Sequence, residues 1–155
     1  MAVQKNINIQ NKKARFEFEI LDKFVAGIQL TGTEIKSIRL SQARITESFC
    51  EFNDRGELFI VNMYIQEYMF GHHFNHKPKS ERRLLLNKRE LRSLKKDVEA
   101  KGNTIVPLRL FINDRGFAKL EIALAKGKQM HDKREVLKAR DSKRDLARIK
   151  KNFNA

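Results

Sequence analysis

The four residues Asn-Asp-Arg-Gly occur twice in this chain, at positions 53–56 and 113–116. Segments rich in apolar residues flank both copies, at 45–52, 57–63, 108–112 and 117–125. Asn and Asp favour tight turns, and a glycine in the last position can adopt a positive φ angle. Each copy therefore predicts a β-hairpin, so the four flanking segments are expected to pair as antiparallel strands.

Two more strands are predicted ahead of the first hairpin. Residues 16–20 alternate strictly between apolar and acidic side chains, which predicts a strand with its apolar residues on one face. Residues 25–30 predict the next strand, and Gly27 inside it marks a bulge or a close approach of another backbone. Pro107 lacks a backbone N–H and suits an edge position or the first residues of a strand.

Two short helices are predicted between these strands. Thr33 is the expected N-cap of the first helix, and Ile35 and Ile38 supply its apolar side. Asn87 is the expected N-cap of the second helix, which Gly102 is placed to end.

Residues 71–83 show no periodicity and carry three histidines and several cations, and we expect a mobile basic loop there.

The element pattern predicts a mainly β fold. About six antiparallel strands with short helices in 125 residues suggest a small closed barrel, with the oligonucleotide-binding (OB) type among the options. We therefore divide the chain into a folded domain at 1–125 and a C-terminal tail at 126–155.

The charge of the chain points to a polyanionic partner. Its 155 residues include 33 Lys and Arg against 19 Asp and Glu, which gives a formal charge of +14 and a pI of about 10.1. Residues 126–155 hold eleven basic and four acidic side chains, a net of +7. Leu146, Ile149 and Phe153 form only a thin apolar stripe there. We expect this tail to be disordered alone and to fold on a partner, the alternative being a merely solubilising tail.

Several classes of protein are excluded by composition. Cys50 is the single cysteine, so a disulfide scaffold is excluded. No apolar run approaches the length of a membrane span, and the N-terminal residues lack the apolar stretch of a secretory signal. The expected compartment is the reducing cytoplasm, without a membrane partner.

The candidate reactive residues do not assemble into a recognisable active site. His72, His73 and His76 resemble a metal cluster, but a structural site needs four ligands and only Cys50 could add a thiolate. Cys50 is better explained as an ordinary half-buried thiol in a strand than as a nucleophile. A small nuclease using these histidines is the remaining enzymatic alternative. We expect no enzyme activity and no cofactor.

Basic residues of the folded domain are better candidates for contacts to RNA phosphates. Residues 11–15 are dense in cations, Lys36 and Arg39 share one face of the first helix, and Lys119 protrudes from the last strand opposite to buried neighbours. A general ribosomal or single-strand RNA-binding protein is an alternative, although the low aromatic content of 8% offers few stacking platforms.

Five ordered motifs make the chain resemble one family, the SmpB or SsrA-binding proteins. The likeness covers nearly the whole chain. The motifs are Asn-Lys-Lys-Ala at 11–14; Ala-Gly-Ile at 26–28 with Gly-Thr-Glu-Ile-Lys-Ser-Ile-Arg at 32–39; Leu-Leu-Leu-Asn-Lys-Arg-Glu-Leu at 84–91; Thr-Ile-Val-Pro-Leu at 104–108; and Ala-Lys-Gly-Lys at 125–128 with His-Asp-Lys-Arg-Glu at 131–135.

The resemblance implies an RNA-binding adaptor of trans-translation on a closed barrel of OB type. Members of the family bind the tRNA-like domain of tmRNA and deliver it to stalled ribosomes. They place the tail, helical on the ribosome, in the empty mRNA channel at the small-subunit decoding centre. The nascent peptide is then tagged for degradation and the ribosome is released, with peptide transfer left to the ribosome. Elongation factor Tu with alanyl-tmRNA is a further implied partner.

The resemblance also assigns site residues by position. Family segments that hold tmRNA contain Asn11, Glu34, Leu86 and Lys119, to which the charge pattern adds Lys12, Lys13, Arg15, Lys36 and Arg39. Glu34 would accept a hydrogen bond from a base or a 2′-OH, or fix a cation such as Lys36, and Leu86 would contact RNA or belong to the core. Val25 stands where the family often has an acid. In the tail the matching residues are Gly127, Lys128, His131, Asp132, Lys133, Arg134 and Ile149.

Overall fold

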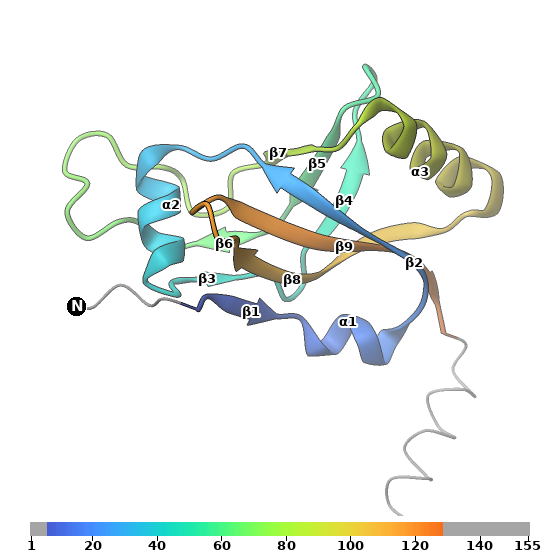
Figure 1. Cartoon of the computed structure of the whole chain (residues 1–155), viewed down its shortest axis with the longest axis horizontal. Helices are drawn as coiled ribbons and strands as arrows, with labels where there is room; N and C mark the ends of the chain where they lie inside the picture. Colours follow the sequence, from blue (N-terminus) through green and yellow to red (C-terminus); the bar gives the residue numbers. More distant parts are fainter. Residues whose placement is uncertain (1–5, 129–155) are drawn as a thin grey trace, which may run out of the picture.

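The structure, a computed structural model, describes residues 6–128, and three long antiparallel strands organise them (Figure 1). Strand β9 (Ala118–Gly127) lies between β2 (Phe18–Ile28) and β8 (Thr104–Ile112) and pairs with both over most of its length. The shorter strands of the same sheet are β1 (Asn8–Gln10), β4 (Phe49–Phe52), β5 (Leu58–Val61) and β7 (Arg82–Leu85).

The strand pairings form a circuit. The order is β1-β8-β4-β5-β7-β2-β9, and β8 also pairs with β9, so the path from β8 through β4, β5, β7, β2 and β9 returns to β8. Two further strands, β3 (Ala43–Arg44) and β6 (Tyr64–Ile65), form a separate pair. The prediction of a mainly β, antiparallel fold is confirmed. The described residues contain nine strands where about six were predicted.

Both predicted hairpins are present, and the two turns use the same hydrogen bonds. The Asn53 carboxamide oxygen accepts from the backbone N–H groups of Arg55 and Glu57 at 3.0 and 2.9 Å. Asn113 does the same for residues 115 and 117 at 3.1 and 2.9 Å. Gly56 and Gly116 have φ angles of 77° and 86°, which side-chain-bearing residues rarely adopt. The local chemistry of the repeated turn thus fixes the pairs β4–β5 and β8–β9.

Two helices cover the main core, and each contributes a fully buried side chain. Ile38 of α2 (Gly32–Arg39) and Leu94 of α3 (Lys88–Lys101) pack on inward-facing strand residues such as Leu84 and Leu120. Helix α3 follows its prediction, because Asn87 accepts from the Glu90 N–H at 2.8 Å and Gly102 ends it in the left-handed conformation. None of the helices in residues 6–128 is long and apolar enough to cross a membrane.

The strand predicted at residues 16–20 is wrong in its first half. Residues Lys12–Glu17 form helix α1, whose N-cap is Asn11, and Ala14 of this helix is buried against Val106 and Leu108. Docking on the sheet overrides the short alternating pattern. Strand β2 then runs without a break from residue 18 to 28, so the two predicted strands are one. The close approach predicted at Gly27 is confirmed, since a Cβ there would lie 3.4 Å from the Leu85 Cβ.

Helix α2 begins two residues before its predicted start. Thr31, not Thr33, is the N-cap, and it forms a capping box with Glu34. The Thr33 hydroxyl instead lies 2.9 Å from Nδ1 of His76. Thr33 is engaged by a residue 43 positions away, whereas Thr31 is free to cap its own helix. The local sequence does not show this difference between the two threonines.

Residues 45–52 form a turn and a strand instead of one strand. The backbone N–H of Ser48 donates to Ile45 at 3.2 Å, and Glu47 has a φ angle of 68°. The break separates β3 from β4. The strand predicted at 117–125 is shifted, because β9 extends to Gly127, two residues beyond the predicted limit of the folded domain.

Pro107 is the fourth residue of β8 and lies between Ile105, which pairs with β4, and Arg109, which pairs with β1. The β8–β9 register also shifts between Pro107 and Arg109. The loop predicted at 71–83 is shorter than expected, because Arg82 and Arg83 belong to β7. Within it His76 is buried, and its two ring nitrogens form hydrogen bonds with the Thr33 hydroxyl and the Ile65 carbonyl. These hydrogen bonds anchor a segment that the sequence predicts to be mobile.

Candidate nucleic-acid interface

The outward side of the sheet carries a row of residues that runs across five strands. Leu85 pairs with Gly27, Gly27 with Lys119, Lys119 with Phe111, and Phe111 with Asn8. Directly opposed residues of antiparallel strands share a face. Their chain neighbours Ala26, Leu84, Leu110 and Leu120 are buried in the core, so this row faces away from it. Lys119 therefore protrudes as predicted.

A second row lies beside the first and adds two arginines. Val25 pairs with Glu121, and Glu121 pairs with Arg109. The Glu121 carboxylate lies 3.3 Å from Nε of Arg109 and 3.8 Å from Nη2 of Arg15 on α1. The Arg109 guanidinium lies 4.2 Å from the ring centroid of Phe111. We call Val25, Gly27, Leu85, Arg109, Phe111 and Lys119 the sheet face.

The sheet face is open to solvent but not bare around Gly27. The Leu85 side chain lies over Gly27, where an added Cβ would be 3.4 Å from the Leu85 Cβ. Glu121 pairs with both Arg109 and Arg15 and neutralises only part of their charge. Sequence reasoning missed Arg109 and Phe111. Their i, i+2 spacing in a strand was the available signal, because it places both side chains on one face.

Lys36 and Arg39, predicted to share one face of their helix, lie at the end of the sheet that carries α2, where Lys36 is exposed and Arg39 half-buried. The Lys36 ammonium lies 5.5 Å from the ring centroid of Tyr68. Nη2 of Arg39 donates to the Gly116 carbonyl at 3.5 Å, which joins α2 to the β8–β9 turn three residues before Lys119. The structure thus brings the helix cations and Lys119 to the same end of the molecule.

Glu34 lies inside the protein and not on this surface. It is 4% exposed, forms a buried ion pair with Arg82, and accepts from the Thr31 N–H at 2.9 Å. Arg82 also donates to the carbonyls of Met63, Lys77 and Pro78 at 2.7, 3.2 and 3.1 Å. Of the two roles considered, Glu34 fixes a cation, but that cation is Arg82 and not Lys36.

Asn11 is also buried, and its side-chain amide is fully engaged. Its oxygen accepts from the Ala14 N–H at 3.2 Å, and its nitrogen donates to Pro107 at 3.0 Å and to Ile45 at 3.4 Å. Asn11 therefore positions α1 and the cations on it. Leu86 is partly buried and packs against the main core.

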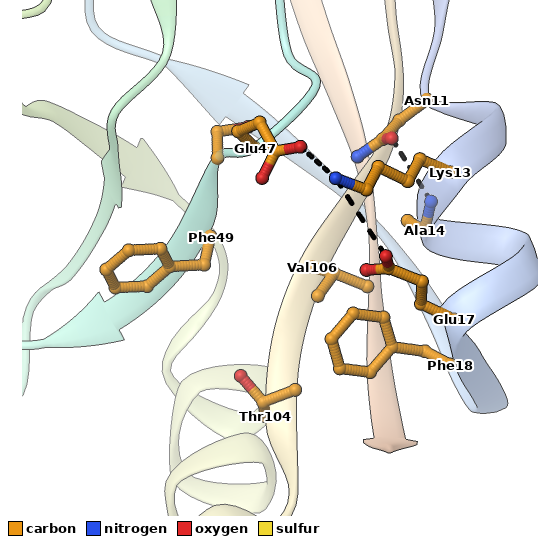
Figure 2. A pocket seen from close by; sticks show the side chains of 10 residues that line it. Asn11, Lys13, Ala14, Glu17, Phe18, Glu47, Phe49, Thr104 and Val106 are labelled. Atoms are coloured by element: carbon orange, nitrogen blue, oxygen red, sulfur yellow. Dashed lines mark hydrogen bonds and ion pairs between the residues drawn. The ribbon is translucent and has the colours of Figure 1, made fainter. Parts of the chain in front are cut away.

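Lys13 lies at the mouth of a cavity of about 190 Å³ between α1, β4 and β8 (Figure 2). Its ammonium pairs with Glu47 and lies 3.9 Å from Glu17. The hydrogen bond to Glu47 is the main cause that raises the pKa of Lys13. Two carboxylates at the mouth oppose the entry of a phosphate, while Lys12 and Arg15 are exposed on the same helix.

The residues considered for catalysis are placed apart. Cys50 is buried, which raises the pKa of its thiol and disfavours the nucleophilic thiolate. His72 and His73 are exposed, whereas His76 is buried. Within residues 6–128, no three His, Cys, Asp or Glu side chains are grouped to hold a metal ion.

The chain leaves the sheet beside α1. Gly127, the last residue of β9, is paired with Phe18, and the Lys128 N–H donates to the Glu17 carbonyl at 3.1 Å. The other tail candidates lie outside the described residues: His131, Asp132, Lys133, Arg134 and Ile149.

Comparison with known proteins identifies the family. The family model described as "SmpB protein" matches residues 8–152. The SsrA-binding protein of Flavobacterium psychrophilum is 66% identical over 149 residues, covering 96% of this chain and 99% of the relative. That of Bacteroides thetaiotaomicron is 51% identical over 146 residues, covering 94% and 97%.

A solved structure supports the same assignment. It is titled "tmRNA-SmpB: a journey to the center of the bacterial ribosome" and matches with a TM-score of 0.67 and 44% identity, covering 84% of this chain and 94% of that one. The family model spans the sheet, α1, α2 and α3 in one continuous match. The chain therefore belongs to the SmpB family of SsrA-binding proteins.

Proposed function

We propose that this chain is an RNA-binding adaptor of trans-translation, which binds the tRNA-like domain of tmRNA and delivers it to stalled ribosomes. The observation that carries this proposal is the continuous family match over residues 8–152 to proteins named for SsrA binding. The solved relative, whose title names tmRNA and the ribosome, supports both partners.

In this proposal the folded domain binds tmRNA. The circuit of six strands supports a closed barrel of OB type, a fold whose outer surfaces bind oligonucleotides. Lys119, Arg109 and Arg15 contact phosphates from the sheet face and α1, and Lys36 and Arg39 extend the contact at α2. Lys12 adds positive charge on α1, and Lys13 contributes once RNA displaces its partners Glu47 and Glu17. The buried Asn11, Glu34 and Leu86 position these elements.

The tail acts on the ribosome in this proposal. Residues 126–155 carry a net charge of +7, which suits a channel lined by RNA. They become helical in the empty mRNA channel, with Ile149 on the apolar side of the helix and Gly127 as the joint. The decoding-centre contacts come from Lys128, His131, Asp132, Lys133 and Arg134, with His131 stacking on a base and the cations binding phosphates.

The proposal divides the labour between protein and ribosome. The protein positions tmRNA, so that the nascent peptide is tagged for degradation and the ribosome is released. Peptide transfer belongs to the ribosome, and the protein acts without a cofactor or catalytic group of its own. Its compartment is the cytoplasm, where elongation factor Tu carries alanyl-tmRNA to the same ribosome.

Recovery of bound RNA from a bacterial extract tests this function. The full-length protein with an affinity tag is incubated with the extract at physiological salt, and the RNA that elutes with it is sequenced. We expect tmRNA to be enriched far above transfer RNA and messenger RNA. Recovery of these RNAs in proportion to their abundance would instead make the chain a general RNA-binding protein, because charge alone does not select among them.

A further inference from the structure

The loop that joins β6 to β7 presents large apolar side chains to solvent. Within residues 66–81, which we call the aromatic loop, Phe74 is 91% exposed, Phe70 63% and Met69 59%. Tyr68 lies edge-on to Phe70 with ring centroids 5.6 Å apart. Several large apolar side chains exposed within one short loop mark a contact site more often than a single scattered one does.

Hydrogen bonds at the base of the loop hold these rings in place. The Asn75 carboxamide donates to the Tyr68 and Gly71 carbonyls at 2.8 and 3.0 Å and accepts from the Tyr68 N–H at 3.1 Å. The His76 ring bridges Thr33 of α2 and the Ile65 carbonyl of β6, each at 2.9 Å. The loop is therefore tied to the same helix that carries Lys36 and Arg39 (Figure 1).

The charges around the loop favour RNA as the occupant. Inside the loop Lys77 and Lys79 are balanced by Glu67 and Glu81, so the local positive excess comes from the neighbouring α2. Lys36 provides it directly, since its ammonium lies 5.5 Å from the Tyr68 ring. Exposed aromatic rings beside cations that reach phosphates are the combination with which proteins bind unpaired nucleotides.

We propose that the aromatic loop is an additional RNA-binding site, in which Phe74 and Phe70 stack on unpaired bases while Lys36 binds the adjacent phosphate. This inference rests on the proposed function. From the sequence this loop was predicted only to be mobile and basic, and the proposal assigns RNA contacts to its aromatic residues. The RNA is either tmRNA or ribosomal RNA, and the two sources are separated by experiment.

A fluorescent substitution tests stacking directly. The chain has no tryptophan, so Phe74→Trp introduces the only indole into the full-length protein. We expect the emission of this variant to be quenched saturably by a transcript of the tRNA-like domain, or by vacant ribosomes, because a base stacked on the ring quenches it. Phe52→Trp is the control, since Phe52 lies beside Lys95 and Val98 of α3, where no RNA contact is proposed, and it should respond to neither.

Affinity measurements complete the test. Phe74→Ala is expected to weaken binding to the responsive RNA by at least about fivefold, the loss of one base–aromatic stack, whereas Phe74→Trp and Phe52→Trp retain wild-type affinity. Phe74→Leu keeps the apolar bulk and loses the π face, so it should behave like Phe74→Ala. Thermal unfolding checks that these substitutions leave the fold intact.

The outcomes separate the two proposals. If wild-type protein binds neither tmRNA nor ribosomes, the proposed function fails. If wild-type protein binds and Phe74→Ala binds equally well in both arms, only the aromatic site is overturned. Wild-type affinity of Phe74→Leu together with weak binding of Phe74→Ala would also overturn it, since an apolar contact to a protein would then explain the loop.

Discussion

At the scale of single residues, the structure separates the predicted RNA contacts into exposed cations and buried positioning residues. Lys119 is outward-facing on the sheet face, whereas Asn11 and Glu34 are each 4% exposed. A buried carboxylate or amide with all its hydrogen bonds formed inside the protein does not reach RNA. Substitutions at the two kinds of position should therefore differ in their effect on stability.

Replacing Lys119 tests the exposed kind. Lys119→Ala is expected to weaken tmRNA binding by about 1 kcal/mol or more and to lower the slope of log affinity against log salt by about 1, because one phosphate contact is lost. Titrations at several salt concentrations measure both. Lys96→Ala, on the exposed side of α3, is the control and should change neither value. An unchanged slope for Lys119→Ala would remove this residue from the interface.

Two adjacent arginines of β7 test the buried kind. Arg82 is paired with the buried Glu34, and Arg82→Ala is expected to lower the free energy of unfolding by about 3–5 kcal/mol, because it leaves an unpaired buried charge. Arg83 lies 3.1 Å from Glu57 at the surface, and Arg83→Ala should cost about 1 kcal/mol or less. Denaturant unfolding compares them. Equal losses would contradict the positioning role of the Arg82–Glu34 pair.

At the scale of elements, helix starts depend on whether the capping side chain is free to cap. Helix α3 is predictable because Asn87 and Gly102 act only on their own neighbours in sequence. In α2 two threonines compete, and Thr33 is engaged by His76, 43 residues away. The short helix α1 exists because Ala14 docks on β8 and β9, since six residues are too few to form a helix unaided.

Thr31 provides the test at this scale. Thr31→Ala removes the side-chain acceptor of the capping box and is expected to lower the free energy of unfolding by about 1 kcal/mol. Thr31→Ser retains the hydroxyl and should remain within a few tenths of a kcal/mol of the wild type, because serine caps as well as threonine. Thermal or urea unfolding measures both. Unchanged stability of Thr31→Ala would show that the cap is misassigned.

At the scale of the whole molecule, Gly127 and the cations of α2 lie at opposite ends of strand β2. Strand β2 begins beside α1, where Gly127 ends β9, and its eleven residues extend to the end of the sheet near α2 and Lys119 (Figure 1). Under the proposed function, the RNA contacts of Lys36, Arg39 and Lys119 therefore do not need the residues that follow Gly127. Binding and tagging should then be separable.

Truncation tests this separation. A chain ending at Gly127 is expected to bind tmRNA with nearly unchanged affinity at physiological salt, where charges farther apart than about 8 Å are largely screened. The same chain should fail to support tagging of peptides made from a message without a stop codon in a reconstituted translation system. The full-length protein is the control for both assays. Loss of tmRNA binding on truncation would contradict the division between domain and tail.

The sequence alone determined the two hairpins and helix α3, because each depends on residues close together in the chain. It also determined the concentration of basic charge after residue 125. The turn residues Asn53 and Asn113 form their hydrogen bonds within four residues, so no distant partner can change the outcome. The five ordered motifs also indicated the family to which the chain belongs. These features are local, and local features are visible in a sequence.

Tertiary structure alone decided which side chains share a surface. The row from Leu85 to Lys119 joins residues 34 positions apart through Gly27, and the Arg82–Glu34 pair spans 48 positions. Neither follows from local spacing, because strand register and the burial of a charge are set when distant segments pack together. The sequence therefore supplied the cations, and the packing of the sheet determined which of them face outward and which are buried in ion pairs.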